Sequence, residues 1–354
     1  MESFMVAACD LDKTLYPPAG PEQGTQLKAN ITGMNAFESM GGFVFPVTGN
    51  NLLMAQKKFM DPEDETRMLR DLRTVPGIYT NGGLVLGPNG KEIEKHALGR
   101  LILQGRTDGL DFVTAMLIFF DDASLKASVL QNVGMLLLAP EYIGGYDASY
   151  SNVDGYAASQ RVSARKMSRE DIIAARGDIL LILLLFPPIS EEKDARQAKE
   201  EYDSVIHPQQ LQILEEMKVY GLMNCMYADG KSEGLGEGIK VTPMKDPWPE
   251  IDINVAGVDK GKALARFLQN SQVLEYLGQR SIDPSSQVAV FGDAPNDVPM
   301  FMAVAGVQPG LRVVMPHADD KILNELSNTK AEVADVLQMI CKAKRDLAQI
   351  RGTG

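Results

Sequence analysis

Two aspartates separated by a single residue follow an apolar segment near the start of the chain, in the run CDLDKT at residues 9–14. The apolar residues 4–8 have the character of a buried strand. Two carboxylates at the end of such a strand repel each other and lose solvation, which is costly unless a cation binds them. Asp10 and Asp12 therefore predict chemistry at a metal ion.

A second acidic group, GDAPND at 292–297, also follows a strongly apolar strand. Ligands of open α/β sheets bind where strands end, so we expect Asp10, Asp12, Asp293 and Asp297 to converge there. Oxygen ligands without His or Cys select a hard cation, and Mg²⁺ is the one expected. Taken alone, GDAPND is more often a turn with a helix N-cap. Its occurrence together with the first motif favours the metal site.

Two further residues fit the same edge of the sheet. Thr48 ends the second predicted strand beside Gly49, where a hydroxyl and backbone N–H groups can hold a phosphate oxygen. Lys260 lies where a strand and a tight turn lead into a helix, so its ammonium can reach this edge. Each has a simpler alternative when taken alone, an N-cap for Thr48 and a solvated surface lysine for Lys260.

Composition excludes several classes of protein. The net charge of −12, from 35 basic and 47 acidic residues, argues against a nucleic-acid or anionic-membrane partner. The three cysteines and three histidines are scattered, so neither a disulfide framework nor a zinc site is expected. The N-terminus shows no secretory signal, and the longest apolar run, 179–186, is too short to cross a bilayer. These features predict a cytoplasmic protein.

Strand-like and helix-like segments alternate at both ends of the chain, whose 354 residues favour two domains. The segment between them mixes apolar runs with charged helical stretches; its best helix former is 191–206, and 144–163 predicts a loop. The order predicts an α/β fold with a Rossmann-like parallel-sheet core, residues 1–83 plus 255–354, and an inserted α+β domain, residues 84–254. Strands are expected at 4–9, 43–47, 250–255, 287–291 and 312–315, and helices at 30–40, 52–60, 260–277, 299–304 and 331–350.

These motifs, in this order, resemble the haloacid dehalogenase (HAD) superfamily of phosphohydrolases. The first motif is DLDKT at 10–14, the second VTG at 47–49, the third VDKG at 258–261 and the fourth GDAPND at 292–297. TNGG at 80–83 before a hairpin and DIN at 252–254 are similar to the Cof-type branch, in which a large α/β cap is inserted between motifs two and three. The chain departs from that branch at Lys13, usually Gly, at Asn50, often Arg, and in MPHA at 315–318, where Gly-Asn-Ala is common.

The resemblance implies a role for each motif residue. Asp10 would be the nucleophile that forms an aspartyl-phosphate, and Asp12 the general acid and then base, with its backbone carbonyl on the metal. Thr48, Gly49 and Lys260 would bind the phosphate. Asp10 and Asp293 would bind Mg²⁺, with Asp297 helping directly or through water. Asn296 would orient Asp293 or Lys260.

The function implied is a Mg²⁺-dependent phosphatase acting on a small phosphorylated metabolite, a sugar phosphate or a related phosphomonoester. The cap would close over the site about hinges near 81–83 and 255–257. Its candidate substrate contacts are Arg161, Arg165, Lys166 and Lys240, although for each of them an exposed charge on a solvated face is the more common explanation. A phosphomutase and a non-catalytic HAD-fold binding protein remain as alternatives, and the sequence leaves open whether the chain forms a homo-oligomer.

Overall fold

The computed structural model describes residues 5–105, 108–146, 150–189, 194–228, 238–244, 248–285, 287–305, 310–318 and 321–352. The chain forms two compact units, Met1–Glu94 with Asp259–Gly354, and Lys95–Val258. The boundaries expected from the sequence lie earlier, after residues 83 and 254. The hairpin that follows residue 83 stays with the first unit because Arg266 Nε donates to Glu94 Oε2 over 3.0 Å. Val258 packs in the hydrophobic core of the second unit.

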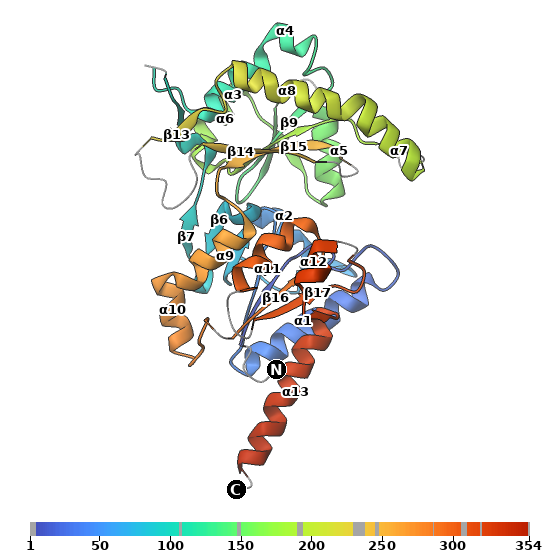
Figure 1. The fold of residues 1–354 in the computed structure, drawn as a ribbon, viewed down its shortest axis with the longest axis vertical. Coiled ribbons are helices and arrows are strands. Elements are labelled where there is room, and N and C mark those ends of the chain that lie inside the picture. The colour runs from blue at the N-terminus through green and yellow to red at the C-terminus, as the bar shows by residue number, and fades with distance from the viewer. Residues whose placement is uncertain are drawn as a thin grey trace. The chain divides into compact units, whose positions relative to one another are not determined.

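The first unit, called the core unit below, contains a parallel five-stranded sheet in the order β18-β17-β16-β1-β2 (Figure 1). Its central strands are short apolar runs buried along their whole length, as expected for a sheet covered on both faces. The strands are β1 (Val6–Cys9), β2 (Phe43–Pro46), β16 (Val288–Gly292), β17 (Leu311–Val314) and β18 (Thr329–Lys330).

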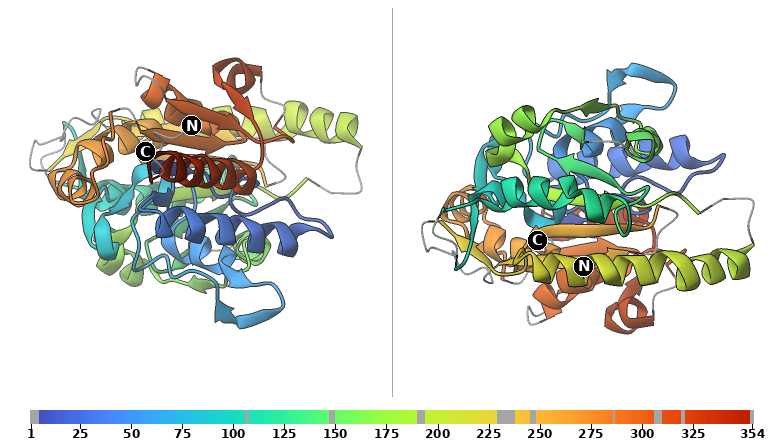
Figure 2. Two further views of the ribbon diagram at one scale, coloured as in Figure 1. Left: turned by 90° about the horizontal axis from the view of Figure 1, so that it is seen from below. Right: turned by 90° about the horizontal axis from the view of Figure 1, so that it is seen from above.

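Helices cover both faces of this sheet (Figure 2). The face formed by Val6, Ala8 and Val290 packs into one hydrophobic cluster with residues of α9, α10 and α11. Because strand side chains alternate between faces, the intervening residues face α1 and α13, which lie side by side (Figure 2). The helices are α1 (Gln23–Ser39), α2 (Leu52–Lys58), α9 (Lys260–Gln269), α10 (Ser271–Gly278), α11 (Val298–Ala305), α12 (Lys321–Leu326) and α13 (Val333–Gly352).

Two small antiparallel sheets complete the core unit, β3-β4 and β5-β6-β7. Thr48 N donates to Ile78 O, which joins the end of β2 to β5. Thr80 and Asn81, directly after β5, both have left-handed backbone conformations, with φ of 52° and 55°. The strands are β3 (Met60–Asp61), β4 (Asp64–Met68), β5 (Gly77–Tyr79), β6 (Leu84–Leu86) and β7 (Glu92–Lys95), and the 3₁₀ turns are η1 (Thr80–Gly82) and η2 (Pro88–Gly90).

The second unit, called the cap unit below, is built on a six-stranded mixed sheet in the order β11-β10-β9-β12-β15-β14, with a separate β8-β13 pair. Its strands are β8 (Leu101–Leu103), β9 (Gly134–Leu138), β10 (Ile143–Tyr146), β11 (Ala164–Lys166), β12 (Leu181–Leu185), β13 (Cys225–Tyr227), β14 (Ile239–Met244) and β15 (Glu250–Val255). Its helices are α3 (Phe112–Asp121), α4 (Ala123–Lys126), α5 (Tyr150–Ser159), α6 (Arg169–Ala175), α7 (Ala195–Glu201) and α8 (His207–Val219), the last two joined by a π turn at Tyr202–Ile206.

These two sheets confirm the expected α/β class with a parallel-sheet core. The loop predicted at 144–163 is wrong: it contains the end of β10 and helix α5, although 147–149 lie outside the described residues. Gly155 is present for close packing, because a Cβ there would lie 2.6 Å from the ring of Trp248. The helix expected over 260–277 is divided at Asn270, which has an extended backbone and caps α10 by accepting from Gln272 N.

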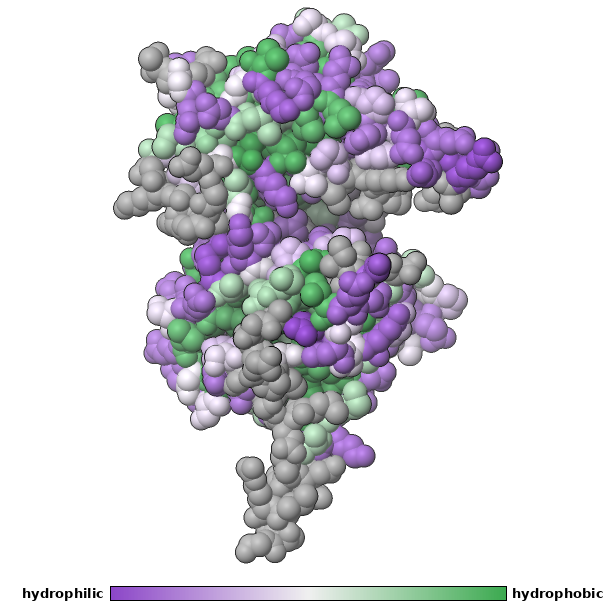
Figure 3. Space-filling model, viewed as in Figure 1, coloured by the Kyte–Doolittle hydropathy of each residue, from purple (hydrophilic) through white to green (hydrophobic). Residues whose placement is uncertain are grey.

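Other expected elements occur with shifted ends. The first helix begins at Gln23, well before residue 30, and the helix expected at 191–206 continues through the π turn into α8. Residues 4 and 191–193 of the predicted elements lie outside the described residues. Hydrophilic side chains cover α7 (Figure 3). No helix in the described parts of the chain is both long and apolar enough to cross a membrane.

Candidate active site

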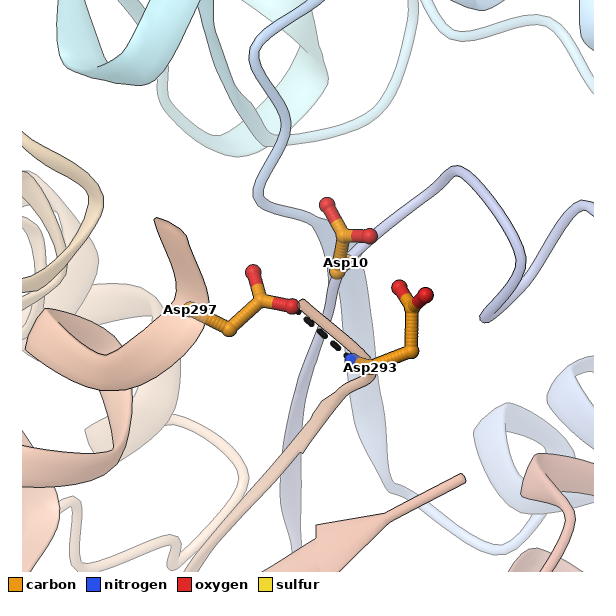
Figure 4. Close-up of side chains that lie close together, drawn as sticks. All are labelled: Asp10, Asp293 and Asp297. Atoms are coloured by element: carbon orange, nitrogen blue, oxygen red, sulfur yellow. Dashed lines mark hydrogen bonds between the residues drawn. The ribbon is translucent and has the colours of Figure 1, made fainter. Parts of the chain in front are cut away.

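Three carboxylates meet where the central strands of the core sheet end. Asp10 follows β1 and Asp293 follows β16, and these strands are neighbours in parallel register. Asp297 comes from the 3₁₀ turn η6 (Pro295–Asp297). Each of the three offers an oxygen, and these oxygens all lie within 4.8 Å of one another. Figure 4 shows the three side chains gathered around the strand ends.

Lys260 joins two of these carboxylates. Its Nζ donates to Asp10 Oδ1 over 2.5 Å and to Asp297 Oδ1 over 2.6 Å, and only 1% of its side chain is exposed. It is the first residue of α9, a helix capped by Asp259, which accepts from Lys262 N. A cation at a helix N-terminus is unfavourable for the helix dipole. The position of Lys260 is therefore explained by the two carboxylates it pairs.

Asp297 also holds the chain that carries Asp293. Its Oδ2 accepts from the backbone N–H of Asp293 over 2.9 Å and from that of Ala294 over 3.1 Å. This arrangement needs a glycine at 292, because a Cβ there would lie 2.6 Å from Asp297 Oδ2. The fully buried Asp297 thus fixes both Lys260 and the loop after β16.

Burial and mutual repulsion perturb this group strongly. Burial and then the charge of Asp297 raise the pKa of Asp10 well above its usual range, against the opposing effect of Lys260. Burial and Asp297 also raise the pKa of Asp293. Burial alone would lower the pKa of Lys260, but Asp10 and Asp297 outweigh it and raise this pKa above its usual range.

The donor set of this group fits a hard divalent cation. When all three carboxylates are ionised they carry three negative charges and Lys260 returns one positive charge, which leaves two negative charges uncompensated in a buried site. Such charges are stable only when they are paired or bind a metal. All the donors are carboxylate oxygens, which Mg²⁺ and Ca²⁺ prefer.

Two further polar residues, Thr14 and His317, approach the carboxylate of Asp293. Thr14 Oγ1 donates to Asp293 Oδ1 over 3.3 Å, and His317 Nε2 lies 3.7 Å from Asp293 Oδ2. His317 follows β17, the next strand of the sheet. The sequence marks its segment as a departure from the Cof-type pattern, and its position after an apolar strand is the one signal that could have placed it at the site.

The loop after β2 forms a second group, beside the other flank of β1. Asn50 donates to Thr48 Oγ1 from its backbone N–H, over 3.1 Å, and from Nδ2, over 3.0 Å. Asn50 Nδ2 also donates to Asp12 Oδ2 over 2.5 Å. Lys58, at the end of α2, donates to Asp12 Oδ1 and, over 3.3 Å, to Asn50 Oδ1. The side chain of Asp12 is thus held by Asn50 and Lys58, outside the group of three carboxylates.

The remaining core residues named from the sequence have simpler surroundings. Gly49 is half-buried, and a Cβ there would lie 3.2 Å from Asn81 Oδ1. Asn296, which the resemblance would have orient Asp293 or Lys260, is exposed, and its neighbour Asp297 bonds to Lys260 and to the backbone N–H of Asp293.

The candidate basic residues of the cap unit do not form one group. Arg165 and Lys166 lie on β11 and Lys240 on β14, which are opposite edges of the same sheet. The guanidinium of Arg165 stacks over the ring of Tyr142 at 4.1 Å from its centroid. Arg161 is exposed and follows α5.

Lys58 is a further site residue that was not predicted from the sequence. It is 6% exposed and follows Met54 and Ala55 on the buried side of α2. A lysine that continues the apolar face of a short helix is an unusual feature. Lys58 is also the last residue of α2, the helix that follows the second motif. Its buried position on that helix is the signal that could have identified it.

Comparison with known proteins gives the following likenesses. Residues 189–337, which include Lys260, Asp293 and Asp297, match the family model of haloacid dehalogenase-like hydrolases. No curated protein sequence matches the chain.

Solved structures match nearly its whole length. A protein from Thermotoga maritima has a TM-score of 0.55 and 21% identity over 95% of this chain and 97% of its own. A protein from Plasmodium vivax, named as a HAD/COF-like hydrolase, has a TM-score of 0.58 and 16% identity over 97% of both chains. The HAD subclass IIB sugar phosphatase BT4131 has a TM-score of 0.50 and 16% identity over 97% of this chain and 98% of its own. The family match thus covers the third and fourth motifs of the resemblance, and the solved structures confirm the expected fold.

Proposed function

We propose that this chain, which has the haloacid dehalogenase-like fold and motifs of the Cof-type branch, is a Mg²⁺-dependent phosphatase that acts through an aspartyl-phosphate. The observation that carries the proposal is the buried Lys260 bonded to both Asp10 and Asp297 beside Asp293. A carboxylate placed between a cation and a candidate metal site is oriented for attack while the charge of an incoming phosphate is screened.

In the first half-reaction a carboxylate oxygen of Asp10 attacks phosphorus in line. The bond from phosphorus to the leaving oxygen breaks, and that oxygen takes a proton from Asp12. In the second half-reaction a water oxygen attacks the phosphorus of the aspartyl-phosphate, its proton passes to Asp12, and the Asp10 carboxylate is released with inorganic phosphate. Both steps require Asp12 to lie within hydrogen-bonding reach of the reacting oxygen.

The metal would be held by the carboxylates of Asp10 and Asp293 and by the backbone carbonyl of Asp12. Asp297 would act indirectly, because its oxygens already accept from Lys260 and from two backbone N–H groups. When bound, Mg²⁺ would neutralise charge on the phosphoryl group during transfer.

Thr48 and Lys260 would bind the phosphoryl oxygens. The hydrogen bonds described for Thr48 Oγ1 are both accepted, from the backbone and side chain of Asn50, so its own proton is available to donate. Gly49 follows it in the loop before α2, where backbone N–H groups can contribute. Lys260 would contact a phosphoryl oxygen while it keeps its bond to Asp297.

The substrate we propose is a small phosphorylated metabolite, a sugar phosphate or a related phosphomonoester. The likeness of fold to a named sugar phosphatase supports this class, and the net charge of −12 disfavours a polyanionic nucleic-acid substrate.

Phosphate release from a panel of sugar and nucleotide monophosphates, with Mg²⁺ or with chelator, tests the proposal. We expect release that requires Mg²⁺ and that falls by several orders of magnitude in Asp10→Asn, because the nucleophile is lost. Asp335→Asn is the matched control, because Asp335 is an exposed aspartate of α13, and it should release phosphate like the wild type.

The same panel separates the alternatives. Equal release by the wild type and by Asp10→Asn would contradict the mechanism. Formation of an isomeric sugar phosphate that depends on a bisphosphate activator would indicate a phosphomutase. Binding of esters by calorimetry without turnover would indicate a non-catalytic binding protein.

A further inference from the structure

Both oxygens of the Asp12 carboxylate are engaged by side chains of the second-motif region. Lys58 Nζ forms an ion pair with Oδ1, and Asn50 Nδ2 donates to Oδ2 over 2.5 Å. Lys58 and Asn50 are bonded to each other over 3.3 Å, which closes a ring of three side chains. A carboxylate bonded on one oxygen can still rotate about its side-chain torsions, whereas one bonded on both, by groups that are themselves joined, cannot.

The surroundings of Lys58 show that this contact is specific. Lysines near a helix C-terminus are common because they interact with the helix dipole, and α2 ends with two, Lys57 and Lys58. Lys57 is exposed, as that explanation predicts. Lys58 instead has 7% of its side chain exposed, and its ammonium meets Asp12. Burying a lysine carries a large desolvation cost, which the dipole alone does not offset.

We propose that Lys58, together with Asn50, is a positioning residue that clamps the Asp12 carboxylate in one orientation. The clamp itself is a structural claim, and its catalytic consequence rests on the proposed phosphatase function. The Asp12 side chain is 49% exposed, so the clamp leaves the carboxylate open to a reacting oxygen while its direction is fixed. Because each carboxylate oxygen has two lone-pair directions, the bonds to Lys58 and Asn50 do not block a proton transfer.

The clamp predicts a defect confined to steps that need Asp12. In Lys58→Met the apolar stem is kept and the ammonium is lost, and water can solvate the exposed Asp12 carboxylate, so the fold should survive. Misplacement of a catalytic group by about 1 Å can lower a rate by about 100-fold. We expect kcat for an alkyl phosphomonoester to fall by about 10- to 100-fold, less than the roughly 10²- to 10⁴-fold that general acid–base catalysis contributes in full, with KM nearly unchanged.

p-Nitrophenyl phosphate separates the two half-reactions, because nitrophenolate leaves without needing a proton. In Lys58→Met, phosphorylation of Asp10 by this ester should stay fast while hydrolysis of the aspartyl-phosphate slows. Rapid mixing should therefore show a stoichiometric burst of nitrophenolate followed by a slow steady state. Lys58→Arg, which keeps a donor at the same place, should recover part of kcat.

Lys57→Met is the matched control. It removes the same charge from the same helix end without touching Asp12, so it should keep wild-type kcat and show no burst beyond that of the wild type. An equal loss in both variants, or a loss in Lys58→Met that appears in KM alone, would overturn the proposal.

A double-mutant cycle, measured by thermal unfolding, tests the clamp independently of catalytic activity. Lys58→Met, Asp12→Ala and the double variant should show coupled losses, the double losing less than the sum of the two single losses. Additive losses would overturn the clamp even in an active enzyme. Coupled losses in a protein that releases no phosphate from any ester would support the clamp and refute the phosphatase.

Discussion

Replacement of Lys260 by methionine should expose how much of the core depends on the charges of the site. The side chain of Lys260 is almost completely buried and is bonded to two buried carboxylates, Asp10 and Asp297. Methionine fills nearly the same volume, so the variant removes a charge and two hydrogen bonds and leaves no large cavity. In the absence of metal, the three carboxylates then lack the ammonium that pairs with two of them.

The expected loss of stability follows from that burial. Removal of one partner from a buried ion pair costs about 3–5 kcal/mol, because the other charge is left without compensation. In a domain of about this size each kcal/mol corresponds to roughly 2–4 °C in Tm. The deficit of Lys260→Met in chelator should therefore exceed that of any exposed lysine on the same helix. Lys262→Met is the control, since an exposed pair such as Lys262 with Asp259 contributes about 1 kcal/mol or less.

The stability that Lys260→Met loses relative to the wild type should increase with pH. The folded-state pKa of Asp10 already lies above its ordinary value, so ionisation of Asp10 destabilises the folded state as pH rises through that pKa. Lys260 lowers this pKa, and its loss raises the pKa further. Below the folded-state pKa Asp10 is protonated and the missing lysine matters less. Above it the carboxylate charge is uncompensated and the loss of stability should be largest.

Unfolding of Lys260→Met, Lys262→Met and wild type, followed by circular dichroism in chelator from pH 5 to 8, checks this reasoning. Mg²⁺ should then stabilise the protein, by about 2.7 kcal/mol at a concentration 100 times its Kd. A Lys260→Met deficit no larger than that of Lys262→Met would refute the argument from burial. A deficit that is the same at every pH would refute the assignment of repulsion to Asp10.

Three further predictions follow from local geometry. Gly292→Ala should lower the free energy of unfolding by about 1–3 kcal/mol, because its Cβ would lie 2.6 Å from Asp297. Gly278→Ala is the control: Gly278 has open space around it in α10, so this variant should gain up to about 1 kcal/mol. Denaturant unfolding measures both. Thr80→Asn should raise Tm, because Thr80 is a β-branched residue in a left-handed conformation whose buried hydroxyl has no hydrogen-bond partner among the described residues; a lower Tm would contradict that explanation. The three cysteines are buried and burial raises the pKa of Cys225 to about 12, so a disulfide thiol reagent should react slowly at pH 8 until the protein is unfolded; rapid modification of the native protein would be contrary to this account.

The core sheet was predictable because each of its central strands is a short apolar run that ends in a polar motif. Runs of this kind identify buried parallel strands from composition alone. In the cap unit the same reasoning failed at 144–163. The glycines and serines there suggested a loop, yet Val153 and Ala157, one turn apart, are fully buried and anchor α5. Gly155 accommodates Trp248, a residue far along the chain that no local pattern reveals.

The arrangement of the candidate site was predictable only in part. Strand order explains why Asp10 and Asp293 are neighbours, since β1 and β16 are paired. Side-chain direction does not follow from strand order. Asp12 was expected near the metal, and only the structure shows that its carboxylate is turned toward Asn50 and Lys58. In the same way Asn296, next to Asp297 in sequence, is exposed while Asp297 is buried.

The two lysines of the site leave a net negative charge that one divalent cation would balance. Four carboxylates, Asp10, Asp12, Asp293 and Asp297, carry four negative charges at this edge of the sheet, and Lys58 and Lys260 return two positive charges. The remaining two negative charges equal the charge of a single Mg²⁺. If Asp12 were not paired with Lys58, three charges would remain and its side chain would compete for the metal. Pairing with Lys58 would therefore keep the Asp12 carboxylate available for proton transfer, while the carboxylates of Asp10 and Asp293 would hold the cation.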